Sequence, residues 1–426
     1  MKIQSHRIRR AFGALAVAVL AVATASCLND ESPITPEIRG GELFDRYVSL
    51  GNSITSGFQS GGINAQTQAA AYPVQLAEKA QAYFNFPALA SPGCPPLLVG
   101  PLTTERESSV PCALRAAPIR APIQNLAVPG ADASDLTDPL GTGTVLTTLI
   151  LGGRTAVQAM QDADPSLVSV WIGNNDALGA AASGVVAPTT LTPLADFQTE
   201  YDAIVAGISA TDAQDAILIG VINAPMAAPA LQPGAYFWAI AQNPPPGLPP
   251  ISVSNNCAPF DLVGDPNPLA FRMISFQGIA NAIGAQAFPI SIDCQTGVAV
   301  PGDPADYLLD ETEMAAIGTR VAEFNAYIQQ QADANGWIYI DPLTLLGPGL
   351  QDPDLIRKCQ ALATATNAQE FAAAVASSCP VNLDQTFFGT WISVDGVHPS
   401  SEAHAAVANA LAAALNSVHG LGLPAS

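Results

Sequence analysis

Short apolar segments with strand-like composition alternate with segments of helical periodicity along most of this chain. The strand-like segments cover 46–50, 123–128, 167–172, 216–222 and 337–340. The helical segments cover 70–83, 194–209, 311–334 and 400–418. Parallel strands need long return connections, usually helices, so this alternation predicts an α/β protein with a parallel sheet and crossover helices.

Three segments interrupt the alternation, near 90–122, 224–305 and 345–390. They are rich in Pro and Gly, and each contains two neighbouring cysteines. Connections of this length inside a compact protein are often functional. We interpret them as insertions into one domain that spans 45–420, and not as separate domains.

A targeting segment is expected before this domain. Basic residues precede the apolar run 11–25. That run is shorter than the roughly 20 residues of a transmembrane helix and is typical of a signal peptide, which we expect over 1–26. Residues 23–25 (ATA) fit an A-x-A cleavage site, which would release a soluble periplasmic or secreted protein. Alternatively, 24–27 (TASC) resembles a bacterial lipobox, with Cys27 as the lipidated residue.

The cysteines favour the lipid anchor and suggest three disulfides. Of the seven cysteines, six lie beyond Cys27, and an exported protein can form disulfides. The pairs with short loops are Cys94–Cys112, Cys257–Cys294 and Cys359–Cys379. Cys27 is then expected to carry the lipid, with 27–44 as a flexible tether and the bacterial cell envelope as the location.

The charge balance excludes one class of partner. The net charge is −21 at pH 7, although charged residues make up only 12% of the chain. An acidic surface repels phosphate backbones, so we expect no nucleic-acid partner. We expect a monomer that reaches the membrane through the lipid on Cys27.

A serine stands at the tip of the first predicted strand. The strand 46–50 runs into Gly51 and Asn52, and Ser53 follows at once. Gly, Asn and Ser are ordinary turn residues. The alternative is that Ser53 is held at the end of a parallel strand as a nucleophile.

A serine nucleophile needs a base, and the expected mature chain offers three histidines. His398 lies three residues after Asp395 and directly before Pro399. A tight turn could place the Asp395 carboxylate on the His398 ring and leave the other ring nitrogen free. His404 and His419 lie in or after an expected surface helix without a local orienting group, so we expect structural roles for both.

Two other strand ends carry candidate oxyanion donors. Segment 123–128 ends near Gly130, and segment 167–172 runs into 173–176 (GNND), which contains Asn175. These residues also suit turns and helix caps. If they are functional, Ser53, Gly130 and Asn175 meet at the carboxyl edge of the sheet.

These motifs, in this order, resemble the SGNH hydrolases, the GDSL esterase/lipase family. Segment 51–55 (GNSIT) resembles the GDSL block with Asn52 in place of Asp, and Gly130 matches the second block. Segment 173–176 matches GxND, and 395–399 (DGVHP) matches the DxxH block. The resemblance covers about 45–418. It implies a three-layer α/β/α fold with a flavodoxin-like parallel sheet of five strands and disulfide-stapled loop insertions.

The resemblance implies a serine esterase or lipase that uses no metal or cofactor. Ser53 would attack a carboxylic ester, His398 would act as the base, and Asp395 would orient it. The N–H groups of Ser53 and Gly130 and the side-chain amide of Asn175 would form the oxyanion hole.

The substrate would be an ester of a lipid or of an acylated glycan. Two other functions stay open: a surface lipoprotein that binds glycan or lipid without catalysis, and an acyltransferase on the same scaffold. The G-x-S-x-G elbow of the α/β-hydrolases does not occur around any serine, which argues against that fold.

Overall fold

A computed structural model describes residues 38–114, 122–224, 228–242, 244, 246–261, 264–345, 367–378 and 387–425. Residues from Arg39 onward belong to one compact unit. The expected signal peptide, the lipidation site Cys27 and most of the tether lie outside the described residues.

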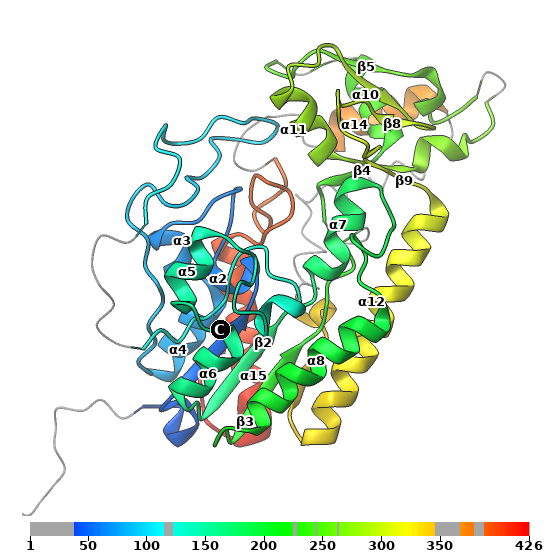
Figure 1. Cartoon of the computed structure of the whole chain (residues 1–426). Coiled ribbons are helices and arrows are strands. Elements are labelled where there is room, and N and C mark those ends of the chain that lie inside the picture. The colour runs from blue at the N-terminus through cyan, green and yellow to red at the C-terminus, as the bar shows by residue number, and fades with distance from the viewer. Residues whose placement is uncertain are drawn as a thin grey trace, which may run out of the picture. The chain divides into compact units, whose positions relative to one another are not determined.

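The centre of the fold is a parallel sheet of four strands (Figure 1). These are β1 (Tyr47–Gly51), β2 (Leu167–Trp171), β3 (Asp215–Ile219) and β10 (Ile338–Ile340), in the order β1-β2-β3-β10. Gly51 lies opposite Trp171, and Trp171 lies opposite Ile219. The carboxyl ends of the strands therefore meet at one edge.

The predicted fifth strand, 123–128, is not a regular strand. It runs beside β1, because Leu126 N–H donates to Ser49 O at 2.9 Å and Val128 N–H donates to Gly51 O at 3.1 Å. Ser49 N–H in turn donates to Gln124 O at 2.9 Å, but the pairing is confined to an isolated parallel bridge between Ser49 and Asn125, and the N–H groups of Gln124 and Asn125 both donate to Asn85 O. With this segment as second in sequence, the order is 2-1-3-4-5, which is the flavodoxin-like order.

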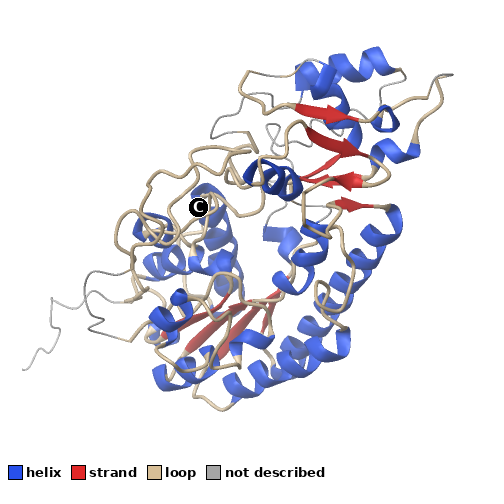
Figure 2. Ribbon diagram, turned by 45° about the horizontal axis from the view of Figure 1, so that its top comes forward, coloured by secondary structure: helices blue, strands red, loops and turns tan. Residues whose placement is uncertain are grey.

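Helices cover both faces of the sheet, so the expected three-layer α/β/α architecture is confirmed (Figure 2). The pair α4 (Tyr72–Ala80) and α15 (Ser401–His419) packs together on one face. The opposite face is covered by α6 (Ala156–Ala163), α8 (Leu194–Ser209) and α12 (Glu311–Asn335). The four predicted helices are α4, α8, α12 and α15, with ends shifted by a few residues at most.

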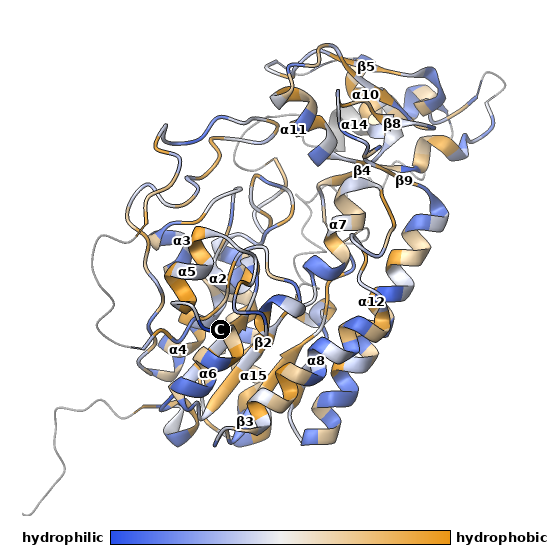
Figure 3. Ribbon diagram, viewed as in Figure 1, coloured by the Kyte–Doolittle hydropathy of each residue, from blue (hydrophilic) through white to orange (hydrophobic). Residues whose placement is uncertain are grey.

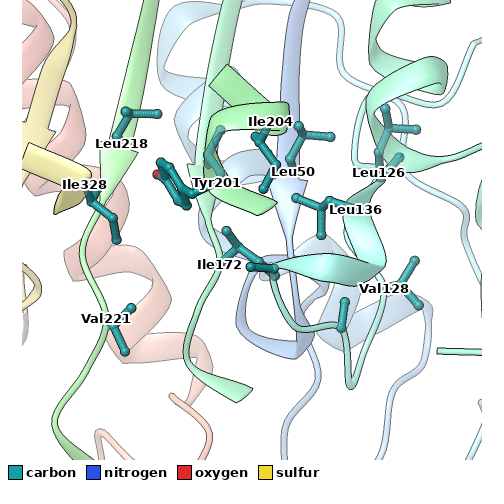
Figure 4. Close-up of a cluster of buried hydrophobic side chains, with 14 of the residues drawn as sticks. Leu50, Leu126, Val128, Leu136, Ile172, Tyr201, Ile204, Leu218, Val221 and Ile328 are labelled. Carbon is teal, nitrogen blue, oxygen red and sulfur yellow. The ribbon is translucent and has the colours of Figure 1, made fainter. Parts of the chain in front are cut away.

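Alternation along each strand fills two apolar layers. In Figure 4, Leu50 and Leu218 lie with Ile204 of α8 and Ile328 of α12 in one cluster. On the other face, the Trp171 ring contacts the Tyr72 ring edge-on at 5.5 Å. Figure 3 shows β2 and β3 as hydrophobic, whereas hydrophilic and hydrophobic residues alternate along α8 and α12. This pattern is expected of strands buried on both faces and of helices buried on one.

Shorter helices follow the strands and shape the carboxyl edge. Two of them begin at residues of the predicted site: α2 (Ser53–Ser56) and α7 (Asn175–Ser183). The helix α5 (Val145–Leu151) follows the segment 123–128. α3 (Ala65–Ala69) and η2 (Ser134–Leu136) lie in the same connections, whereas η1 (Gly41–Phe44) precedes β1.

The predicted insertion near 224–305 folds around an apolar core of its own. We call residues 230–309 the cap; it begins with β4 and ends with β9 (Figure 1). Tyr236, Phe276 and Phe388 belong to this second core, to which 387–388 contribute from outside the cap. The cap packs against α7 through β6 and α11. It therefore stands beside the carboxyl edge of the central sheet.

Two small sheets and short helices build the cap. The first sheet is antiparallel, and the second pairs β5 with β7 in parallel and β7 with β8 antiparallel. The first consists of β4 (Leu231–Pro233), β6 (Met273–Ser275) and β9 (Leu308–Leu309). The second consists of β5 (Ile251–Val253), β7 (Ile290–Asp293) and β8 (Gly297–Val298). The helices are α10 (Gly234–Gln242), η3 (Asn255–Cys257), η4 (Pro268–Phe271) and α11 (Phe276–Gly284), and α14 (Ala368–Ser378) packs on α10.

Two of the three predicted disulfides are present. Cys94 bonds to Cys112 in the first insertion, and Cys257 bonds to Cys294 in the cap. Cys359 and Cys379, together with most of the segment 345–390, lie outside the described residues. Within the part of the chain that is described, no helix combines the length and apolar character needed to cross a bilayer.

Candidate active site

Ser53 is the first residue of α2, directly beyond β1. A Cβ at Gly51 would lie 2.7 Å from the main-chain oxygen of Trp171 on the next strand, so this position needs glycine. Asn52 then caps α2, because its Oδ1 accepts from Ile54 N–H at 3.1 Å. The cap leaves Ser53 N–H at the helix start, where no intrahelical acceptor exists. Gly51 and Asn52 therefore place both the hydroxyl and the N–H group of Ser53 at the end of β1.

A chain of hydrogen bonds joins Ser53, His398 and Asp395. His398 Nε2 lies 2.9 Å from Ser53 Oγ, and His398 Nδ1 lies 2.9 Å from Asp395 Oδ2. Ser53 is only 8% exposed, and both partners are largely buried. This is the geometry of a nucleophile, its base and the group that orients the base.

Asp395 is held by more donors than the histidine ring alone. Its Oδ1 accepts from the N–H groups of Val397 and His398, both at 2.9 Å, and its Oδ2 also accepts from Gly61 N–H at 2.7 Å. Burial works to raise the pKa of the Asp395 carboxyl. The positive charge of His398 and the hydrogen bonds outweigh burial and lower that pKa to about 2. Asp395 is therefore an anion at neutral pH.

The loop 58–62 completes this arrangement, and sequence reasoning did not find it. Phe58 N–H donates to Ser53 O at 2.9 Å, and the Phe58 ring lies 4.9 Å from the His398 ring. Ser60 N–H donates to Ser393 Oγ at 2.8 Å. The loop thus ties Ser53 to the segment 393–398. Its only sequence signal is the glycine pair 61–62, which is ordinary for a turn.

The predicted oxyanion donors belong to two segments that contact each other. Asn175 opens α7, and its Nδ2 donates to Ala131 O at 2.7 Å. The next residue, Asp176, accepts from Ala133 N–H at 3.0 Å. These bonds clamp the loop that carries Gly130 onto the start of α7. Gly130 has a φ of +90°, a region that favours glycine.

Asn174 is a further residue of this edge. Its Oδ1 accepts from Ile222 N–H at 2.9 Å, which ties the end of β2 to the end of β3. Its Nδ2 is buried and has no hydrogen-bond partner among the described residues. The sequence contains Asn174 within the GNND segment, but nothing local indicates this bond to Ile222.

Comparison with known proteins places this chain in a family. The family model described as GDSL-like lipase/acylhydrolase matches residues 47–411. The chain belongs to the GDSL-like lipase/acylhydrolase family. No curated protein matches the chain.

Solved structures of similar fold include esterases and lipases. One is a catalytic mutant of Axe2, an acetylxylan esterase from Geobacillus stearothermophilus, at 11% identity and TM-score 0.34, covering 89% of this chain and 95% of that chain. An extracellular lipase from Streptomyces rimosus has 14% identity and TM-score 0.31, covering 78% and 98%. A phospholipase A1 from Streptomyces albidoflavus has 15% identity and TM-score 0.28, covering 87% and 98%.

The other two histidines of this GDSL-like chain do not contact Ser53, but their surroundings differ from expectation. His404 is fully buried between α15 and α4, not on a surface, and its Nδ1 accepts from Tyr72 N–H at 3.3 Å. Burial lowers the pKa of His404 to about 3, with a smaller contribution from His398. His419 Nε2 lies 2.6 Å from Asp215 Oδ2. Its acidic partner is distant in sequence, so local inspection could not find it.

Two carboxyl groups that interact with Asp132 have raised pKa values. Burial raises the pKa of Asp176 to about 7, and the charge of Asp132 adds to the rise. Burial and the charge of Asp176 raise the pKa of Glu200 to about 7 as well. Among the described residues, no three His, Cys, Asp or Glu side chains are grouped so that they could hold a metal ion.

Two cavities meet at His398. The smaller one, about 50 Å³, is lined by Ser53, Asn175 and Ile222 among others. The larger one, about 550 Å³, is lined by Asp395, by residues of loop 98–106 and by the start of α11. Both are lined by Leu178, Ala228, Val397 and His398. Gly130 is not among the described residues that line either cavity; it is linked to them through the bond between Ala131 and Asn175.

Proposed function

We propose that this protein is a serine-dependent carboxylic ester hydrolase. The observation that carries the proposal is the pair of 2.9 Å contacts that connects Ser53 Oγ through the His398 ring to Asp395. Membership of the GDSL-like lipase/acylhydrolase family supports acyl hydrolysis as the reaction class. The substrate is proposed to be an ester of a lipid or of an acylated glycan.

The arrangement supports a two-stage reaction. Ser53 Oγ attacks the ester carbonyl carbon while His398 Nε2 takes the serine proton. The tetrahedral intermediate collapses as His398 returns that proton to the leaving alcohol, which leaves an acyl-Ser53 ester. Water then attacks this ester with His398 as base, and the acid and free Ser53 are released. Asp395, ionised at neutral pH, orients the ring and stabilises its charged form.

The carbonyl oxygen becomes negative in both tetrahedral intermediates. The proposed donors are the N–H groups of Ser53 and Gly130 and the amide of Asn175. The Asn175 amide has two hydrogens, and the bond to Ala131 O uses one of them. The other is available to the oxyanion. Loss of one such donor lowers kcat by about 10²–10³-fold.

Labelling of the serine tests this function. A fluorophosphonate probe should modify the oxidised wild-type protein at Ser53, and p-nitrophenyl esters should be hydrolysed. Ser53→Ala should lose both labelling and turnover, His398→Ala should lose turnover, and the matched variant Ser109→Ala should keep both. Circular dichroism checks that each variant is folded. A folded wild-type protein with neither labelling nor turnover would favour a binding lipoprotein, and turnover only with an added alcohol acceptor would favour an acyltransferase.

We further propose that Cys27 is lipidated and anchors the chain to the bacterial cell envelope. The apolar run 11–25 followed by Cys27 supports this. Metabolic labelling with a fatty acid should mark the wild-type chain in the membrane fraction. Cys27→Ser should remove the label and release the protein. Unlabelled wild-type protein in the soluble fraction would favour cleavage after residues 23–25.

A further inference from the structure

Loop 58–62, which contacts Asp395, is itself held by the first insertion. Arg106 of that insertion supplies the side-chain contact, because its Nη1 donates to Gly61 O at 2.8 Å and also to Pro96 O. This nitrogen carries two hydrogens, so each carbonyl receives one. The planar guanidinium of Arg106 therefore ties the loop to the start of the insertion.

The main chain of the insertion keeps Arg106 in place. Arg106 pairs with Leu98 in an antiparallel bridge. The disulfide between Cys94 and Cys112 closes the stretch that contains both residues. Leu98 N–H in turn donates to Ser60 O at 2.8 Å. The hairpin that carries Arg106 is thus bonded to the loop by its main chain as well as by the guanidinium.

Gly61 is the residue at which the insertion and the catalytic groups meet. Its N–H donates to Asp395 Oδ2 at 2.7 Å, and this oxygen lies 2.9 Å from His398 Nδ1. Gly61 has a φ of +64°, and glycine has more backbone freedom than other residues. Only two soft dihedrals separate its N–H from its carbonyl. The direction of the N–H therefore depends on Arg106, the side chain that holds the carbonyl.

Two roles are consistent with the position of Arg106. It also lines the large cavity, so it could contact a substrate directly, or it could act on the catalytic groups through Gly61. In the described part of the chain, no ion pair includes Arg106. Its bonds to two main-chain oxygens favour the second role, because they hold the guanidinium against the protein.

We propose that Arg106 is a positioning residue for ester hydrolysis. It holds Gly61 so that the glycine N–H stays on Asp395. Asp395 then keeps the His398 ring aimed at Ser53 Oγ. This inference rests on the proposed esterase function and adds the first insertion to it. The effect of Arg106 should appear in kcat, because a misaligned imidazole slows proton transfer in both stages of the reaction.

Replacement of Arg106 by alanine tests the proposal in the full oxidised protein, with p-nitrophenyl acetate as substrate. Reactive sites are titrated with the fluorophosphonate. We expect kcat per labelled Ser53 to fall about 10- to 100-fold, as for lost hydrogen bonds to a charged group, with little change in KM. The matched control is Arg154→Ala, which should leave kcat unchanged. Arg154 also donates to a main-chain oxygen, that of Leu151, but is not among the described residues that line either cavity.

Chemical rescue separates a positioning role from a loss of folding. Ethylguanidinium fits the space left in Arg106→Ala and can donate to the same two carbonyls. At concentrations well below those that unfold the protein, it should raise the kcat of this variant by about threefold or more. It should leave Ser393→Ala unchanged, because that variant lacks a different bond of the same loop. Circular dichroism checks the fold of each variant.

Arg106→Lys is the second variant if the alanine prevents folding. Lysine keeps the charge but lacks the planar fork, so kcat should fall by about 3- to 10-fold, again with little change in KM. Unchanged kcat in this variant would contradict the proposal.

The outcomes separate this inference from the proposed function. A higher KM with unchanged kcat in Arg106→Ala would overturn the inference and show that Arg106 contacts the substrate. Unchanged kcat and KM, or a loss of kcat that ethylguanidinium does not reverse, would overturn it as well. Each of these results leaves the esterase function standing. Absence of labelling and of turnover in the wild-type protein would contradict the esterase function itself.

Discussion

Gly61 N–H donates to the same Asp395 oxygen that contacts the His398 ring, at 2.7 Å from the glycine and 2.9 Å from Nδ1. The two residues lie 334 positions apart in the sequence. The loop that begins just beyond Ser53 thereby fixes the carboxylate that orients the base. The distance between Ser53 and His398 thus depends on how loop 58–62 docks on 393–398.

Ser393 should act as a positioning residue for this contact. Ser393→Ala removes the acceptor of Ser60 N–H and loosens loop 58–62 against Asp395. We expect kcat for a small ester to fall about 5- to 20-fold, the effect of losing one hydrogen bond, with little change in KM. Ser401→Ala, which removes a more exposed bond to Gln59, should stay within twofold. Equal losses in both variants would contradict the positioning role.

His404 should matter for stability and not for the reaction. His404→Ala leaves a cavity and an unpaired Tyr72 N–H, so we expect the free energy of unfolding to fall by about 2–3 kcal/mol. Turnover per labelled Ser53 should stay within twofold, as titrated by the fluorophosphonate. A large loss of turnover in folded protein would instead give His404 a part in the chemistry.

The same histidine should make the protein sensitive to acid. The folded-state pKa of about 3 lies below the ordinary value of 6.5, so the unfolded chain binds the proton more readily between these values. The contribution of neutral His404 to the free energy of unfolding is fully present above about pH 6.5 and is lost as the pH falls toward 3. His404→Asn keeps an acceptor for Tyr72 N–H and cannot titrate. It should lose less stability than the wild type between pH 6.5 and 4 in urea unfolding.

Asp176 should have the opposite pH dependence. Its folded-state pKa of about 7 lies above the ordinary 3.8, so stability is highest below about 3.8 and falls as the pH rises through 7. Asp176→Asn keeps an acceptor for Ala133 N–H and removes the charge. The stability of the variant relative to wild type should therefore increase between pH 4 and 8, by an amount on the order of 3 kcal/mol. A difference between Asp176→Asn and the wild type that stays constant from pH 4 to 8 would contradict the assignment.

The cap should depend on its disulfide. Cys257–Cys294 spans 37 positions, and closing a loop of that length stabilises a protein by about 3–4 kcal/mol. Replacement of both cysteines by serine should lower the unfolding temperature while the fluorophosphonate still labels Ser53. The disulfide Cys94–Cys112 closes a shorter loop, of 18 positions. Replacing Cys94 and Cys112 by serine should therefore lower the free energy of unfolding by less. Unchanged unfolding in the cap variant would show that the apolar core alone holds the cap.

Local patterns predicted the central sheet and its helices well, and the exceptions have identifiable causes. Segment 123–128 has strand composition and pairs with β1 at Asn125, but the N–H groups at 124 and 125 donate to Asn85 O, and the segment does not form a regular strand. His404 was expected in a surface helix, because its neighbours in sequence offer it no orienting group. Its burial depends on the packing of α4, which comes from the other end of the chain.

By itself, the sequence determined the α/β class, the positions of β1, β2 and β3, and the short list containing Ser53, Gly130, Asn175, Asp395 and His398. Strands, helices and turn residues are local properties, so periodicity and motif spacing record them. Only the tertiary structure brought loop 58–62 onto Asp395, tied Asn174 to Ile222, and formed the two cavities that His398 lines. These features arise between segments far apart in the chain, where contact depends on how helices and the cap pack together and not on the residues nearby in sequence.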